Sequence, residues 1–248
     1  MATENHPYLT LKGLENQLEL TKKEIKAGGY LPGGIWFKDT KTIVCGTFPP
    51  RTEYEDKKGK KRKGYLHYSS NRNEFWRHFD AIFGETLYQK LYEDGERIKS
   101  AIDKIKVIKS KKIGFIDIFT KVQRKPTKRQ NAKDSNLIPV ETIFDNGTFK
   151  KTLKNSVYNY IFVYSLARNS FKTELKKAFI DVKCQVVQER TADNIPEVIK
   201  ATINEKTIYF TYAPIHGRRI PPKRRQDALK DAFKRIIRNR SRNPNPCP

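Results

Sequence analysis

The amino-acid sequence predicts an α/β protein, a three-layer α/β/α sandwich with a central, mostly parallel sheet. Apolar, β-branched runs of strand length recur along the chain and alternate with amphipathic stretches of helix length. That alternation is typical of a parallel sheet with helices on both faces. The length of 248 residues is enough for one well-buried domain, whereas two would be small. We therefore expect a single domain over residues 1–238.

The first third of the chain contains one predicted helix and one predicted strand. Apolar residues at positions 14, 18, 20 and 25 form one face of a helix over residues 14–27, which Gly28 and Gly29 end. The strand is the apolar run 43–45, which stops at Gly46 and two prolines. A basic insertion follows at residues 55–64, and as a solvated loop it would need no function.

The same patterns predict the remaining elements. Helices are expected over residues 73–83, 86–110 with an interruption near Gly95, 169–179 and 222–238. Strands are expected over residues 158–164, 182–188 and 206–212, and residues 113–120 form an apolar segment with a single acid, Asp117. The Arg- and Pro-rich residues 239–248 are expected to be a disordered basic tail.

The charge balance indicates a nucleic-acid partner. The chain has 51 lysines and arginines against 27 acidic residues, a net charge of +24. Each phosphate that such a surface neutralises releases counterions and strengthens binding. Composition alone leaves nonspecific RNA affinity open as an alternative. No basic amphipathic helix with a bulky apolar face favours a membrane partner.

The cysteines and the amino terminus indicate the compartment. Three widely spaced cysteines without a CxxC pair argue against a disulfide framework and against a cysteine-based zinc or iron–sulfur site. No secretory signal and no apolar run of about 20 residues is visible. We therefore expect a cytoplasmic protein in a reducing environment, and a monomer.

Two motifs carry a resemblance to a known family. The predicted strand runs into Gly46-Thr47-Phe48-Pro49-Pro50, and Tyr68, Asn73, Phe75 and Trp76 follow after the basic insertion. In this order and spacing the motifs resemble the uracil-DNA glycosylase superfamily, in particular its mismatch-specific and hypoxanthine-removing branches. Short matches support the resemblance further along the chain: Gly114, Asp117, Arg124 and Asp134-Ser135-Asn136.

The resemblance implies a base-binding pocket and three catalytic residues. Thr47, Phe48, Pro49 and Tyr68 would bind the base, with Phe48 or Tyr68 stacking on it. The candidate catalytic residues are Asn73, Asp117 and His216. Many members have Asp or Asn where this chain has Phe48, and a His-Pro-Ser or Asn-Pro-Ser motif where it has Ala213-Pro214-Ile215-His216. Those replacements move the catalytic role toward Asn73, Asp117 and His216.

Each of these candidates also has a structural interpretation. Tyr68 could be a core aromatic residue, Asn73 a helix cap, and Asp117 a hydrogen-bonded structural carboxylate. His216 lies in a Gly-Arg-Arg loop after a predicted strand, where it could donate to a base oxygen or to a phosphate. The predicted DNA contacts are the basic residues that flank the motifs: Lys60, Lys61, Arg62, Arg72, Arg218, Arg219 and Arg224.

The function implied by the resemblance is that of a monofunctional DNA glycosylase. It would flip out a damaged or modified base and hydrolyse the N-glycosidic bond, leaving an abasic site. Uracil and hypoxanthine are the first candidates, and a bulky modified cytosine of phage DNA is another, so base-excision repair and anti-phage defence both remain open. The alternative is an inactive nucleic-acid-binding module of the same fold. No cofactor or metal is expected, since no Walker loop, GxGxxG or metal-ligand spacing is present.

Overall fold

The computed structural model describes most of the chain. The described residues are 2–19, 33–37, 39–56, 58–67, 75–88, 94–125, 136–155, 160–163, 168–179, 182–188, 197–203, 205–212, 223, 226–227 and 230. The predicted helix over residues 222–238 and the predicted tail lie almost wholly outside them.

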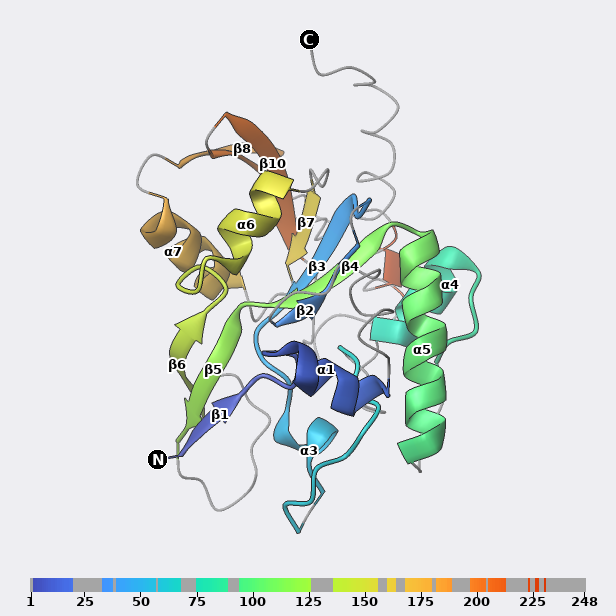
Figure 1. Cartoon of the computed structure of the whole chain (residues 1–248). Helices are drawn as coiled ribbons and strands as arrows, with labels where there is room; N and C mark the ends of the chain where they lie inside the picture. The colour runs from blue at the N-terminus through green and yellow to red at the C-terminus, as the bar shows by residue number, and fades with distance from the viewer. Residues whose placement is uncertain are drawn as a thin grey trace.

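A seven-stranded sheet forms the centre of the molecule (Figure 1). In order across the sheet its strands are β2 (Gly34–Ile35), β4 (Ile113–Asp117), β3 (Thr42–Gly46), β7 (Tyr160–Val163), β10 (Lys206–Tyr212), β9 (Val198–Ile203) and β8 (Lys183–Gln188). The four inner strands from β4 to β10 are parallel, and β2, β9 and β8 pair antiparallel.

The expectation of a mostly parallel sheet is therefore wrong for the sheet as a whole. Only two residues separate β9 from β10, and a connection that short forces the two strands to run antiparallel. The strand β9 was not predicted, although residues 199–203 alternate apolar and polar side chains. Among the described strands, antiparallel pairings outnumber parallel ones.

A smaller antiparallel sheet lies beside the large one. It contains β1 (Thr3–Asn5), β5 (Phe119–Arg124) and β6 (Leu137–Thr142), in the order β1-β5-β6. Only Ile118 separates β5 from β4, so the chain passes directly from the large sheet into the small one. The pairing of β1 with β5 brings the amino-terminal residues against the end of β4.

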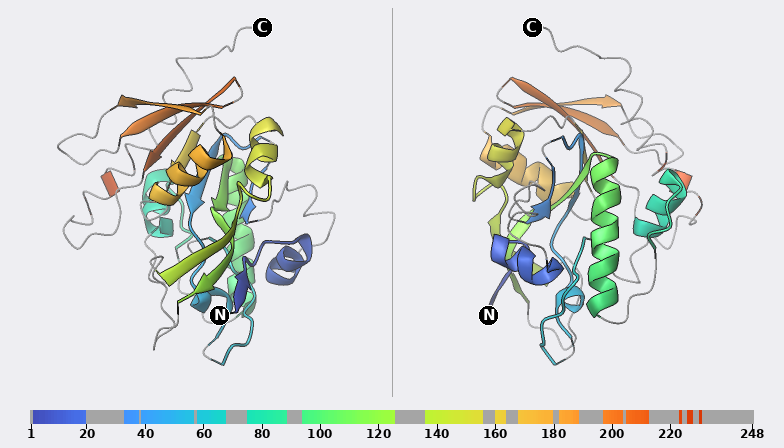
Figure 2. Two further views of the ribbon diagram at one scale, coloured as in Figure 1. Left: turned by 90° about the vertical axis from the view of Figure 1, so that its left-hand side faces the viewer. Right: turned by 45° about the vertical axis from the view of Figure 1, so that its right-hand side comes forward.

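Helices cover both faces of the large sheet (Figures 1 and 2). On one face, Trp76 of α4 (Phe75–Phe83) packs on Phe115 of β4, with ring centroids 5.6 Å apart. On the other, Phe171 of α7 (Arg168–Ala178) packs on Phe210 of β10 at 5.7 Å. In the register of the parallel strands, Phe115 is level with Thr211, the residue after Phe210. Successive strand residues point to opposite faces, so Phe115 and Phe210 lie on opposite faces of the sheet.

The other helices join these two layers. Lys104 of α5 (Asp94–Ser110) lies over the ring of Trp76 at 5.1 Å, so α5 packs beside α4. Phe149 of α6 (Thr148–Asn155) lies 6.0 Å from Phe171, so α6 packs beside α7. The observed α5 starts eight residues later than the predicted helix over residues 86–110.

The amino-terminal helix differs more from its prediction. α1 (Leu11–Leu18) begins after Thr10, whose hydroxyl accepts the N–H of Gly13 at 3.0 Å. It ends at Glu19, which takes a left-handed φ of 54°. The predicted helix over residues 14–27 thus starts too late, because Thr10 caps the helix before the first apolar position of the pattern, and residues 20–27 lie outside the described residues.

The basic insertion forms a tight hairpin rather than a loose loop. Glu55 and Lys61 pair across it, and Gly59 turns the chain with a φ of +80°. The carboxylate of Asp56 accepts the backbone N–H groups of Lys58 and Lys60, each at 2.8 Å. The short helix α3 (Arg51–Tyr54) leads into this hairpin.

No helix in the described part of the chain is both long and apolar enough to cross a membrane.

Candidate functional site

The first motif forms a loop at the carboxyl end of β3. Gly46, the last residue of β3, is level with Asp117, the last residue of the parallel strand β4. The two segments stay paired beyond the ends of these strands. The N–H of Ile118 donates to the carbonyl of Gly46 at 3.0 Å, and the N–H of Phe119 donates to the carbonyl of Thr47 at 2.9 Å. The carboxyl edge of parallel strands is where ligands bind in open α/β sheets.

The ring of Phe48 is packed inside this loop. It is only 5% exposed, and it meets the His6 ring edge to face with the two centroids 5.6 Å apart. The guanidinium of Arg124 lies 5.6 Å from its centroid and donates to the carbonyl of Pro49 at 3.0 Å. Phe48 thus helps to hold the loop, and its predicted stacking on a base stays a prediction that requires the ring to become accessible.

Asp117 lies at the centre of a buried polar cluster. Nε2 of His6 is 3.0 Å from Oδ2 of Asp117, and Nε2 of His67 is 3.5 Å from the same oxygen. The two imidazoles stack with centroids 5.7 Å apart, and all three side chains are at least 96% buried. We call these three residues the His–Asp cluster.

Hydrogen bonding fixes the tautomer of His6. The backbone N–H of Tyr8 donates to Nδ1 of His6 at 3.0 Å, so Nδ1 carries no proton. The neutral ring therefore has its proton on Nε2, where it donates to Asp117. His6 is an oriented hydrogen-bond donor to the carboxylate.

Burial shifts the pKa of each group in the cluster. It raises the pKa of Asp117 to about 6, although His67 and a hydrogen bond from Tyr65 lower it. Burial lowers the pKa of His6 to about 3. Burial also lowers the pKa of His67 to about 4, while the charge of Asp117 acts in the opposite direction. At neutral pH the cluster therefore holds one carboxylate and two neutral imidazoles.

The His–Asp cluster also has the composition of a metal site. No metal is expected from the sequence, yet one ligand atom from each of the three residues lies within 4.8 Å of the others. A metal ion on Nε2 of His6 would have to displace the proton there. The ring would then need a proton on Nδ1, which faces the N–H of Tyr8. The hydrogen bonds thus fit a proton-sharing cluster better than a metal centre.

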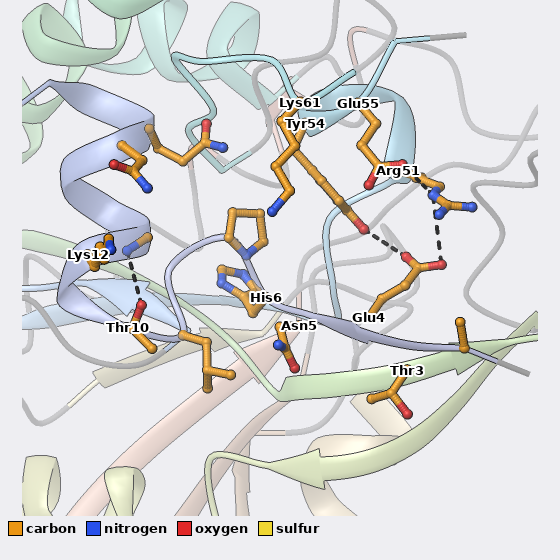
Figure 3. A pocket seen from close by; sticks show the side chains of 16 residues that line it. Thr3, Glu4, Asn5, His6, Thr10, Lys12, Arg51, Tyr54, Glu55 and Lys61 are labelled. Atoms are coloured by element: carbon orange, nitrogen blue, oxygen red, sulfur yellow. Dashed lines mark hydrogen bonds and ion pairs between the residues drawn. The ribbon is translucent and has the colours of Figure 1, made fainter. Parts of the chain in front are cut away.

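A pocket of about 490 Å³ lies against the cluster (Figure 3). It is lined by β1, by the first turns of α1, by α3 and by the basic hairpin. His6 forms part of its wall and is also bonded to Asp117. Arg51, another wall residue, directly follows the Gly46–Pro50 loop. The pocket is therefore connected to the buried acid through His6 and to the loop through Arg51, while neither Asp117 nor residues 46–50 line it directly.

The structure places some of the predicted site residues and leaves others outside the described residues. Thr47, Phe48, Pro49 and Asp117 come together at the carboxyl edge of β3 and β4, and Lys60, Lys61 and Arg62 lie on the hairpin. Those outside the described residues are Tyr68, Arg72, Asn73, His216, Arg218, Arg219 and Arg224.

The described neighbours of the remaining candidates lie near the cluster or at its edge of the sheet. His67, which directly precedes Tyr68, belongs to the His–Asp cluster. The strand β10 runs parallel to β7, itself parallel to β3, and ends at Tyr212, four residues before His216. The roles of Tyr68, Asn73 and His216 stay predictions.

Sequence reasoning missed both histidines of the cluster. His6 lies 111 residues from Asp117, in a polar amino-terminal segment without periodicity. The one available signal was rarity, since the chain has only four histidines. Nearby aromatic residues do not single out the two, since His78 also lies beside one, Phe79.

Comparison with known proteins identifies no family. No protein-family model matches the chain, and no curated protein matches it. A solved structure from Methanosarcina acetivorans, described as a "putative Uracil DNA glycosylase", is similar in part, with a TM-score of 0.37 and 18% sequence identity. The match covers 58% of this chain and 74% of that one.

Proposed function

We propose that the protein is a monofunctional DNA glycosylase, which flips a damaged or modified base out of DNA and hydrolyses its N-glycosidic bond. The observation that carries the proposal is the pairing of Gly46 with Asp117 at the carboxyl edge of β3 and β4. It brings the first motif beside a buried carboxylate, although the two are 71 positions apart by their numbers in the chain. The net charge of +24 supports DNA as the partner.

The chemistry needs little beyond charge and position. Cleavage of the bond develops an oxocarbenium ion on the sugar and negative charge on the leaving base. Asp117, ionised at neutral pH and oriented by His6, would stabilise the cation or activate the attacking water. Asn73 would contact the base or orient that water, and His216 would donate to a base oxygen or a nearby phosphate.

The residues of the two motifs do not decide which base the proposed glycosylase removes. Uracil and hypoxanthine are the first candidates. Phe48 and Ala213 replace side chains that would contact a small base, which favours testing a bulkier modified cytosine as well. Repair and anti-phage defence are then distinguished by which DNA is cleaved.

The test is abasic-site formation followed by strand scission. Separate duplexes would carry uracil, hypoxanthine or hydroxymethylcytosine, and native phage DNA would supply glucosylated cytosine. We expect abasic sites in one of these classes. Asp117→Asn should lower turnover by about 100- to 10,000-fold while DNA affinity stays within about twofold. Asp103→Asn, which alters an exposed acid on α5, is the matched control.

Other outcomes would redirect the proposal. Asn73→Ala and His216→Ala should also lose turnover. Full activity in these two variants and in Asp117→Asn would show that the catalytic residues are assigned wrongly, although the protein would still be a glycosylase. DNA binding without abasic sites on any substrate would instead support the inactive binding module.

A further inference from the structure

The pocket beside the His–Asp cluster has walls of mixed chemistry. Tyr54, Pro7 and Leu9 supply apolar surface, and the side-chain amides of Asn5 and Asn16 supply donors and acceptors. Its volume of about 490 Å³ lies within the range of about 300–1,000 Å³ that is typical of small-molecule sites. The pocket can therefore hold a ligand of nucleotide size.

Both carboxylates in the walls are already bound by protein cations. Glu4 accepts hydrogen bonds from Nε of Arg124 at 2.9 Å and from the hydroxyl of Tyr54 at 2.8 Å. Glu55 accepts Nε of Arg51 at 2.6 Å. Figure 3 shows Glu4, Tyr54, Arg51 and Glu55 on one side of the pocket. Neither acid is left to bind a cationic ligand or to repel an anionic one strongly.

Two lysines in the walls are not used in this way. Lys12 comes from α1 and Lys61 from the basic hairpin, and neither pairs with a carboxylate anywhere in the described part of the chain. The Lys61 side chain extends from the hairpin into the pocket (Figure 3). Two ammonium groups on separate walls favour an anion between them, and a phosphate can accept several such charge-assisted hydrogen bonds.

We propose that this pocket binds a phosphate-bearing nucleotide unit, with Lys12 and Lys61 on the phosphate and the asparagine amides near the base. The inference rests on the proposed function in one respect, because His6, which donates to Asp117, forms part of the wall of this pocket. The unit could belong to a DNA strand or be a free nucleotide, which present the same chemistry.

Binding can be measured without any turnover. A fluorescein-labelled single-stranded hexanucleotide of unmodified bases would be titrated with the full chain and followed by anisotropy, and competitors would then be added. We expect a deoxynucleoside monophosphate to compete, the matching deoxynucleoside to compete at least tenfold more weakly, and inorganic phosphate to fall between them. Competition by the monophosphate only far above the hexanucleotide concentration would identify the strand as the ligand.

Variants separate the pocket from general electrostatics. Lys12→Gln with Lys61→Gln should weaken binding of the monophosphate at least tenfold. The control is Lys150→Gln with Lys172→Gln, which removes the same charge from exposed positions on α6 and α7. The inference is overturned if both pairs weaken binding equally, or if phosphate-free and phosphate-bearing competitors act alike. Glycosylase failure with intact, lysine-dependent monophosphate binding would reject the proposed function alone.

Discussion

Nε2 of His6 donates to Oδ2 of Asp117 across 3.0 Å in a buried environment, and the N–H of Tyr8 fixes the proton on that nitrogen. This bond ties the amino-terminal segment to the end of β4, where the first motif is also attached. A buried carboxylate that loses its donor is costly, because the desolvation penalty remains. The bond should therefore affect both stability and the state of Asp117.

A pair of His6 variants tests that role. Glutamine can place an amide N–H near the position of Nε2, whereas leucine of similar size cannot donate. Both lose the acceptor for the N–H of Tyr8, so that loss cancels in the comparison. We expect His6→Leu to lower the free energy of unfolding by about 1–3 kcal/mol more than His6→Gln, measured by urea denaturation at pH 7. Equal losses would show that the bond to Asp117 contributes nothing.

The pKa shifts predict how stability depends on pH. The pKa values of His6 and His67 are lowered by burial to about 3 and about 4. Between about pH 6.5 and 4 the unfolded chain therefore takes up two protons that the folded chain does not. The pKa of Asp117 is raised to about 6, so the folded chain takes up one proton between about pH 6 and 3.8 that the unfolded chain does not. Between about pH 6 and 4 the net difference is about one proton, and stability should fall there by about 1.4 kcal/mol per pH unit on acidification.

Replacing one imidazole provides the control for this slope. In His67→Phe one histidine and one aspartate remain with opposite effects, so the contribution of the cluster between pH 4 and 6 should be close to zero. Other titrating groups are common to both proteins and cancel. Denaturation curves at several pH values would measure the two slopes, and parallel slopes would contradict the assignment.

The tautomer of His6 also predicts how the cluster responds to metal ions. Because Nε2 carries a proton and donates a hydrogen bond to Asp117, one equivalent of Zn²⁺ or Mn²⁺ should leave the melting temperature unchanged within about 1 °C. Removal of metal with EDTA should not change it either. Elemental analysis of the purified protein should find no stoichiometric metal. A bound cation that is lost in His67→Phe would show instead that the three side chains are ligands.

The parts of the structure that sequence predicted well depend on local patterns. The apolar runs of β3 and β10 and the apolar faces of α4 and α7 have short-range periodicity, and they were placed within a few residues. Asp117 stood out as the single acid in an apolar segment. In each case the signal lies within about ten residues of the chain.

The parts that failed depend on long-range contacts. Strand direction at the edge of the large sheet follows from the hairpin into β10, which requires β9 to be recognised first. His6 reaches Asp117 only because β1, a strand of three polar residues, pairs with β5. No local pattern marks that pairing, so sequence could name the acid but not its two histidine neighbours.

A glycine beside the basic hairpin provides a last test of the packing around the pocket. Gly64 has a φ of +72°, and a Cβ there would lie 2.6 Å from backbone atoms of Arg97 and Ile98 on α5. Gly59 has a similar φ of +80°, but a Cβ would meet nothing within 4 Å. Gly59→Ala should thus lose only the roughly 1 kcal/mol of a left-handed alanine, whereas Gly64→Ala adds a backbone clash. We expect urea denaturation to show Gly64→Ala less stable by at least a further 2 kcal/mol or so. Similar losses in both variants would mean that the hairpin does not pack closely on α5.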